Sequence, residues 1–264
     1  VMGQMPLLDA YQLSERYSRE RGRVFLTGTQ AIVRIALDQA RRDWSPELLA
    51  ASGLTAAQMP GLVEGSAVSG RVRPSLARNL GLRAGVVVAG GAGDAAAGGV
   101  GIGAVEDGDA FVSLGTSGQY FVTGDSYRPY PEVFLHAFCH ALPERWLQMA
   151  AMLNGASCLA WAARLLGEAD PAALLARVEA GYRGPSRLLF LPYLSGERTP
   201  HNDPNARGVL FGLDADSSAT EVTQAVLEGV AFSFAEAQDC LASAGTRVAA
   251  VAAIGGGARS PLWM

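Results

Sequence analysis

The chain has 264 residues, 49% of them hydrophobic and 17% charged, so it can bury a full core and does not have the composition of a disordered protein. Its formal net charge of −4 argues against a nucleic-acid partner, whose electrostatic footprint would be basic. No apolar run reaches the roughly 20 residues of a membrane span, and the N-terminus lacks the pattern of a signal peptide. The length favours two domains.

Two residue types constrain the chemistry. Cys139, Cys158 and Cys240 are sparse and show no CxxC spacing, which predicts reduced thiols in the cytoplasm. All 21 basic residues are arginine, so mechanisms that need a Walker-A lysine or a protein-kinase lysine are closed to this chain. A nucleoside triphosphate would have to be held by backbone N–H groups and a metal ion.

The first third of the chain gives weak signals. Residues 1–45 move between patterns without clear turn chemistry. Ser45 then opens a capped helix that stops near Gly53, and a second short segment, Ser75 to Leu80, ends before Gly81.

The pattern sharpens from residue 86. A short buried strand is predicted at 86–89, and the glycine-rich turn 90–94 then leads into an alanine-rich helix. Strands at 109–114 and 119–123 flank the turn 115–118, which predicts a β-hairpin.

The remaining elements continue a mixed α/β layout. Strands at 134–141 and 145–149 are expected to extend an antiparallel meander, and a helix at 153–166 is expected to stop at Gly167. A buried strand is predicted at 187–191. A long helix at 220–244 and an apolar strand at 248–254 complete the order, which differs from strict βαβ alternation.

The first of three glycine loops contains Asp94, at a strand end and a helix start. A carboxylate there is stabilised by the helix dipole, and a plain N-cap aspartate explains the position equally well. The run 91–96 also matches the GxGxxA dinucleotide fingerprint, which would favour a dinucleotide-dependent reductase. That fingerprint requires an acidic residue at the end of the next strand, where this chain has Leu114 and Gly115.

The other two loops also follow strands. In the second loop, successive N–H groups and two hydroxyls could cradle phosphate oxygens, although a plain hairpin turn is the simpler interpretation. In the third, glycines could admit a flat nucleoside against the main chain, although a mobile turn would look the same. The second loop consists of Gly115, Thr116, Ser117 and Gly118, and the third contains Gly256, Gly257 and Ala258. Three such loops together predict one nucleotide cleft.

The histidines receive structural interpretations. His136 and His140 are four residues apart in a strand-like run, where such spacing does not converge on a metal, so we predict no protein-held metal site. His201, in a proline-rich loop, is expected to order that loop.

One long pattern resembles a known family. Gly208 to Leu213, followed after seven residues by Glu221 to Glu228, is similar to a signature of the FGGY carbohydrate kinases at every constrained position. This resemblance implies an α/β, two-domain, actin-like (ribonuclease H-like) ATPase fold with a cleft between the domains. It further implies an N-terminal sugar-binding domain whose remnant is 1–104, ending at the hinge, and a C-terminal nucleotide-binding domain at 105–264.

Three further blocks resemble the branch of the family that phosphorylates the ketose D-xylulose. They are 138–143, 191–202, and 254–260 with Trp263, and the resemblance runs from about residue 46 to 264. The implied reaction is ATP-dependent phosphorylation of a ketose with Mg²⁺, giving D-xylulose 5-phosphate. Another sugar or polyol of the same family stays open, as does a non-catalytic regulator that binds nucleotide or sugar.

The family motifs map onto this chain position by position. The resemblance implies a catalytic base that also contacts sugar at Asp94, further sugar contacts at Gln4 and Met5, and ATP contacts at Gly115, Thr116, Ser117, Gly118, Gly155, Gly256, Gly257 and Ala258. Two positions depart from the pattern: Pro6 replaces the histidine of the sugar-contacting block, and Ala95 follows the base where asparagine is common.

A larger departure concerns the N-terminal region. The family's first phosphate loop, Gly-x-Asp-x-Gly-Thr, is missing, and residues 1–45 resemble family fragments joined with pieces missing between them. We therefore expect the native protein to be longer, and an intact mass near 27.5 kDa would contradict this. The implied partner is a small-molecule sugar; a homodimer stays open.

Overall fold

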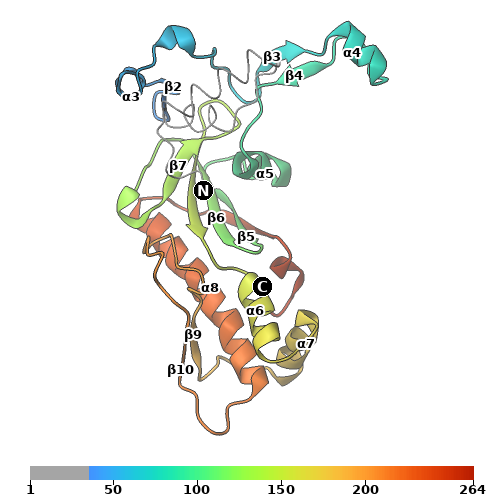
Figure 1. The fold of residues 1–264 in the computed structure, drawn as a ribbon, viewed down its shortest axis with the longest axis vertical. Helices are drawn as coiled ribbons and strands as arrows, with labels where there is room; N and C mark the ends of the chain where they lie inside the picture. Colours follow the sequence, from blue (N-terminus) through green and yellow to red (C-terminus); the bar gives the residue numbers. More distant parts are fainter. Residues whose placement is uncertain (1–35) are drawn as a thin grey trace. The chain divides into compact units, whose positions relative to one another are not determined.

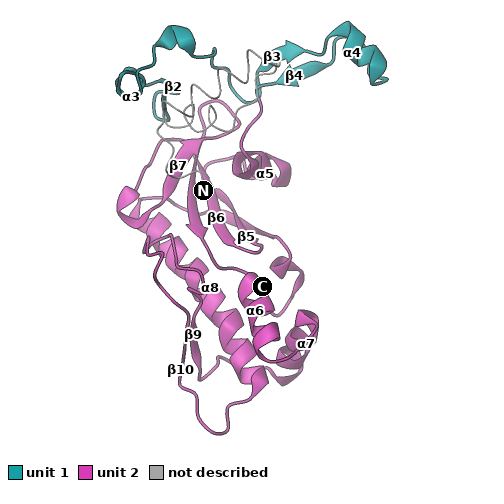
Figure 2. Cartoon of the chain, in the orientation of Figure 1, with its two compact units in different colours: residues 1–90 teal, residues 91–264 magenta. Residues whose placement is uncertain are grey.

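The computed structural model describes residues 36–264 and divides the chain into two compact units, residues 1–90 and 91–264 (Figures 1 and 2). Each unit is described by itself. The predictions for Gln4 and Met5 lie outside the described residues. None of the helices within 36–264 combines the length and apolar character that crossing a bilayer requires.

The first unit contains short helices that begin and end where the sequence indicates. The helix α3, Pro46–Ala51, is capped by Ser45, whose Oγ accepts a hydrogen bond from the Leu48 N–H (3.2 Å). The helix α4, Pro74–Asn79, ends before Gly81, which has a φ of 66°. A 3₁₀ turn, η2, spans Ala56–Gln58.

The strands of the first unit form two-stranded ribbons. The strand β1, Leu37–Asp38, pairs with β2, Asp43–Trp44, and β3, Val68–Arg71, pairs with β4, Val87–Ala89. The prediction that 86–89 is buried is wrong: all three residues of β4 are exposed. Its only partner within the described residues is β3, and a two-stranded ribbon leaves both of its faces open.

The second unit is built on a five-stranded mixed sheet in the order β11-β5-β6-β8-β7. The predicted hairpin is confirmed, with Leu114 opposite Gly118, and β11 runs parallel to β5, with Ile254 opposite Ser113. The strands are β5 Asp109–Leu114, β6 Gly118–Gly124, β7 His136–Cys139, β8 Trp146–Met152 and β11 Ala250–Ile254.

The expected meander has a different strand order. The strand β8 pairs with both β6 and β7, so it lies between them, and β7 is at the edge. The connection 125–135, which contains the 3₁₀ turn η3 (Pro131–Val133), carries the chain past the place that β8 later fills.

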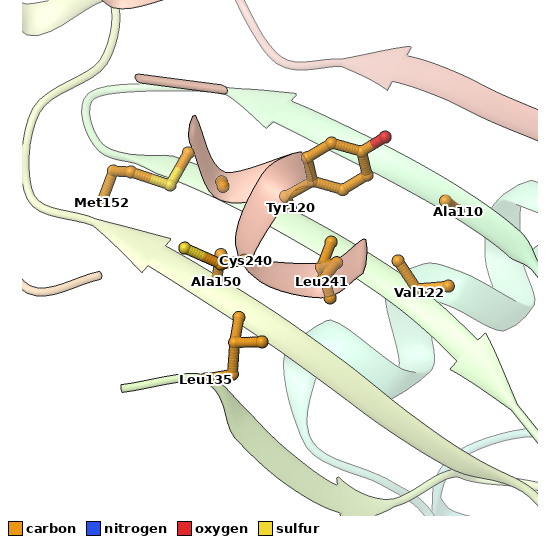
Figure 3. Close-up of a cluster of buried hydrophobic side chains, with 9 residues drawn as sticks. Ala110, Tyr120, Val122, Leu135, Ala150, Met152, Cys240 and Leu241 are labelled. Atoms are coloured by element: carbon orange, nitrogen blue, oxygen red, sulfur yellow. The ribbon is translucent and has the colours of Figure 1, made fainter. Parts of the chain in front are cut away.

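Helices cover both faces of this sheet. On one face, side chains of β5, β6 and β8 pack against Cys240 and Leu241 of α8, Ala219–Ser243 (Figure 3). On the other face, α5, Asp94–Ile102, packs on Phe111 and Phe121, whose rings stack with centroids 4.6 Å apart. Alternate residues of β5 therefore face opposite layers.

The N-terminal half of α8 organises a second layer of elements, namely α6 Ser157–Leu165, α7 Pro171–Gly181, β9 Leu189–Leu191 and β10 Val209–Phe211 (Figure 1). A capping box between Ser218 and Glu221 starts α8, close to the predicted start. The helix α7 and the strand β10 were not predicted, and α6 begins four residues later than predicted.

Candidate active site

The turn between β5 and β6 is in backbone contact with the start of α6. The Ala156 N–H donates to the Gly115 carbonyl (2.7 Å), and the Ser157 N–H donates to the Thr116 carbonyl (3.3 Å). A Cβ atom on Gly155 would lie 2.7 Å from both the Gly115 oxygen and the Ser117 carbonyl carbon. Only glycine permits this approach, so the turn and the residue before α6 form one unit.

The loop after β11 meets the same strand end. Gly255 has a φ of 95°, and a Cβ there would lie 2.7 Å from the carbonyl carbon of Leu114. Gly257 is buried, and its Cβ would lie 2.4 Å from Leu114 Cγ. The third glycine loop is therefore packed against the residue that leads into the second.

Three of the predicted nucleotide segments thus come together where the parallel strands β5 and β11 both end. These segments, which we call the glycine junction, are 115–118, Gly155 and 255–258. Ligands of open α/β sheets bind outside the carboxyl ends of the strands, which is where this junction lies. The Thr116 and Ser117 side chains are exposed, so the turn can be approached from solvent. Backbone N–H groups and two hydroxyls are donors suited to an anionic phosphate.

Asp94 lies in the same unit but is built into it differently. The N-cap of α5 is Gly93, so Asp94 occupies the first helical position and the N-cap interpretation is wrong. Its side chain is exposed, and Oδ1 accepts a hydrogen bond from the Ala95 N–H (2.9 Å). The dipole of α5 stabilises negative charge at this end of the helix.

The opposite side of α5 fixes the helix on the sheet. Ala96 is buried, and a Cβ on Gly99 would lie 2.8 Å from the ring of Phe121. Because the helix is held this closely, the backbone that carries Asp94 has a defined position on the unit that also holds the glycine junction.

Glu197 is a buried residue for which the sequence predicts no role. Its side chain is 2% exposed, and Oε1 accepts hydrogen bonds from the N–H groups of Leu153 and Arg198, both at 2.7 Å. Burial raises the pKa of the Glu197 carboxyl, and the bonds from Leu153 and Arg198 act in the opposite direction. The block 191–202 contained this residue, but a glutamate in a loop is usually a surface residue.

A polar cluster links the same loop to α8. The Tyr193 hydroxyl is 2.9 Å from His201 Nε2 and donates to Glu236 Oε2 (3.3 Å). Burial, and then the charge of Glu236, raises the pKa of Tyr193 to about 12. These contacts fit the loop-ordering role expected for His201.

Comparison with known proteins shows the family. Residues 110–264 match the C-terminal domain of the FGGY family of carbohydrate kinases, and residues 24–101 match the N-terminal domain. The chain is 48% identical over 227 residues to the xylulose kinase of Escherichia coli, which covers 86% of this chain and 47% of that protein. It thus spans about half the length of the curated relatives it matches.

Solved structures agree. The crystal structure of a xyloylose kinase from Brucella ovis is 49% identical with a TM-score of 0.83, covering 86% of this chain and 47% of that chain. The glycerol kinase of Plasmodium falciparum, at 18% identity and a TM-score of 0.76 over 87% of this chain and 46% of that one, shares the fold. The predicted α/β, actin-like fold class is confirmed.

Proposed function

The chain belongs to the FGGY family of carbohydrate kinases, and from this premise we propose that the protein transfers the γ-phosphoryl group of ATP to a hydroxyl of a ketose sugar. The xylulose kinases among its relatives favour D-xylulose as the acceptor and D-xylulose 5-phosphate as the product. The observation that carries this proposal is the glycine junction, where three separate segments pack against one another at the end of two parallel strands and the Thr116 and Ser117 side chains are exposed.

Each segment of the junction has a role in the proposal. The turn Gly115–Gly118 would hold phosphate oxygens, Gly155 would let α6 approach that turn, and Gly256–Ala258 would lie against the adenosine. With no lysine in the chain, Mg²⁺ bound to the phosphates would supply the charge neutralisation that backbone donors alone do not. Gln4, Met5 and Asp94 would contact the sugar.

Asp94 would act as the general base. As the sugar hydroxyl oxygen bonds to the γ-phosphorus, the bond from that phosphorus to the bridging oxygen breaks, ADP leaves, and Asp94 accepts the hydroxyl proton. Such assistance is typically worth about 10²–10⁴-fold in rate. An exposed carboxylate at a helix N-terminus is accessible for this work, and it bonds to the neighbouring Ala95 N–H.

The proposal includes the arrangement expected for the family. Residues 1–104 would belong to the N-terminal sugar-binding domain, ending at the hinge, and 105–264 to the nucleotide-binding domain; the family matches at 24–101 and 110–264 support this division. We place the protein in the cytoplasm, where the sugar and ATP are available, and a homodimer is part of the same proposal.

The test is ADP release by the native full-length protein across a panel of ketoses and polyols. We expect D-xylulose to give the highest kcat/KM. ADP release with another acceptor alone would replace the substrate, and nucleotide binding without ADP release on any acceptor would favour a regulatory protein of the same fold.

A further inference from the structure

We propose that Glu197 is a positioning residue for nucleotide binding, because its buried carboxylate holds the backbone immediately before Gly155 in place against the phosphate turn. The inference rests on the proposed function, since it concerns the nucleotide that the glycine junction would bind. Glu197 itself would contact neither the nucleotide nor the sugar.

The contacts of Glu197 converge on the segment that precedes Gly155. Its Oε1 accepts from the Leu153 N–H (2.7 Å), and its Oε2 accepts from Asn154 Nδ2 (3.5 Å). Asn154 is also 2% exposed, and its Nδ2 donates to the Gly196 carbonyl (2.8 Å). A buried carboxylate and a buried amide therefore lock the end of β8 to the loop that carries Glu197.

Because the space around Gly155 is so small, the position of Leu153 and Asn154 determines the position of the turn 115–118. Gly155 directly follows Asn154, and a Cβ atom added to Gly155 would lie only 2.7 Å from the Gly115 carbonyl oxygen. The next residue, Ala156, donates to that same oxygen (2.7 Å). A shift of a few tenths of an ångström at Leu153 would therefore move the Gly115 peptide or break its hydrogen bond.

Anchoring of the loop does not by itself require Glu197. Thr199 already ties this loop to β8: its N–H donates to the Ala151 carbonyl (3.2 Å), and its Oγ1 accepts from the Ala151 N–H (3.2 Å). Thr199 does this with uncharged groups, whereas burying a carboxylate is costly. The contribution that only Glu197 makes is its pair of bonds to Leu153 and Asn154, next to the proposed nucleotide site.

The experiment compares Glu197→Ala, Glu197→Gln and Glu236→Gln in the native full-length protein. Glu236→Gln is the matched control, because Glu236 also contacts this loop, through Tyr193, and lies apart from the bonds to Leu153 and Asn154. For each variant we would measure the KM for ATP, the KM for the sugar, kcat, the Kd for a fluorescent ATP analogue, and the Tm.

For Glu197→Ala we expect the KM and Kd for nucleotide to rise about tenfold or more, the equivalent of losing one charge-assisted hydrogen bond, with the sugar KM within about twofold of native. Glu197→Gln keeps an acceptor for Leu153 and presents an N–H donor to Asn154, so its nucleotide constants should lie between those of the native protein and the alanine variant. Glu236→Gln should leave them within about twofold.

Two results would overturn the inference. If Glu197→Gln lowers the Tm while the nucleotide Kd and KM stay at native values, the residue is structural only and the proposed function stands. If the native protein binds no nucleotide, the proposed function fails together with the inference. Should Glu197→Ala not fold, the Gln variant decides.

Discussion

The two parts of the proposed site are constructed in contrasting ways. At the glycine junction, backbone meets backbone so closely that a single added carbon at Gly155 or Gly255 would lie within 3 Å of a carbonyl group. Asp94 is exposed, and within residues 36–264 its carboxylate bonds locally, to the Ala95 N–H. The junction depends on shape, which tolerates no added atom at these glycines. The role proposed for Asp94 depends on its chemistry, so an isosteric replacement there should be tolerated structurally but not in function.

The largest effect should come from Asp94→Asn. The amide keeps the shape and can still accept from the Ala95 N–H, but it cannot take up the hydroxyl proton. We expect turnover to fall about 10²–10⁴-fold with nucleotide Kd and Tm close to native. ADP release and thermal unfolding check this, and more than about a tenth of native turnover would remove Asp94 from the base role.

The next largest effect is expected for Gly155→Ala, which should weaken nucleotide binding and lower stability, the two properties that Asp94→Asn should leave close to native. The added methyl forces the Gly115 carbonyl or the Ser117 peptide to move, so nucleotide affinity should drop at least tenfold and stability should fall by about 1–3 kcal/mol. Calorimetric titration of ATP and denaturant unfolding measure the two quantities. Native affinity in this variant would mean that the turn does not hold the phosphates.

A pair of substitutions on α5 separates steric contact from helix propensity. Gly99→Ala places a methyl 2.8 Å from the Phe121 ring and should destabilise the protein by about 1–3 kcal/mol. Gly101→Ala is the matched control, since nothing lies within 4 Å of its Cβ, and it should stabilise the helix by about 0.5–1 kcal/mol. Equal effects of the two changes on the denaturation midpoint would contradict the packing described for α5.

The smallest effect concerns an exposed ion pair outside both parts of the site. Hydrogen bonds from Arg187, and then from Ser217, hold the pKa of Asp214 well below its usual range. A lowered folded-state pKa gives stability that is present above the unfolded value and is lost as pH falls towards the folded one. The small Tm advantage of the native protein over Asp214→Asn should therefore shrink between about pH 5 and pH 2. Activity at pH 7 should be the same in both proteins.

Much of the fold could be predicted from local signals. Glycines with positive φ end α3, α4 and α8 as expected, and Ser218 starts α8 through its capping box with Glu221. The order of the strands could not be predicted, because placing β8 between β6 and β7 depends on long-range pairing. The helix α7 was missed although Asp170 and Pro171 mark its start, with Asp170 Oδ1 accepting from the Ala172 N–H (2.9 Å).

Parts of the candidate site could likewise be predicted from local sequence signals, and other parts depend on long-range contacts. The glycine loops 115–118 and 255–258 could be found because each follows an apolar strand, whereas Gly155 was implied by the family resemblance alone; the structure adds that the three segments touch one another. Glu197 could not be found, since Leu153, whose N–H bonds to its buried carboxylate, is 44 residues away in the chain. No local pattern distinguishes such a carboxylate from a solvated one.

Hydrogen–deuterium exchange with and without ATP tests the central claim most directly. If the glycine junction is the nucleotide site, peptides covering 115–118, 155–157 and 255–258 should gain protection together, while α7 exchanges as before. Protection of none of these peptides, or of one without the others, would contradict the account that the three segments form a single nucleotide site.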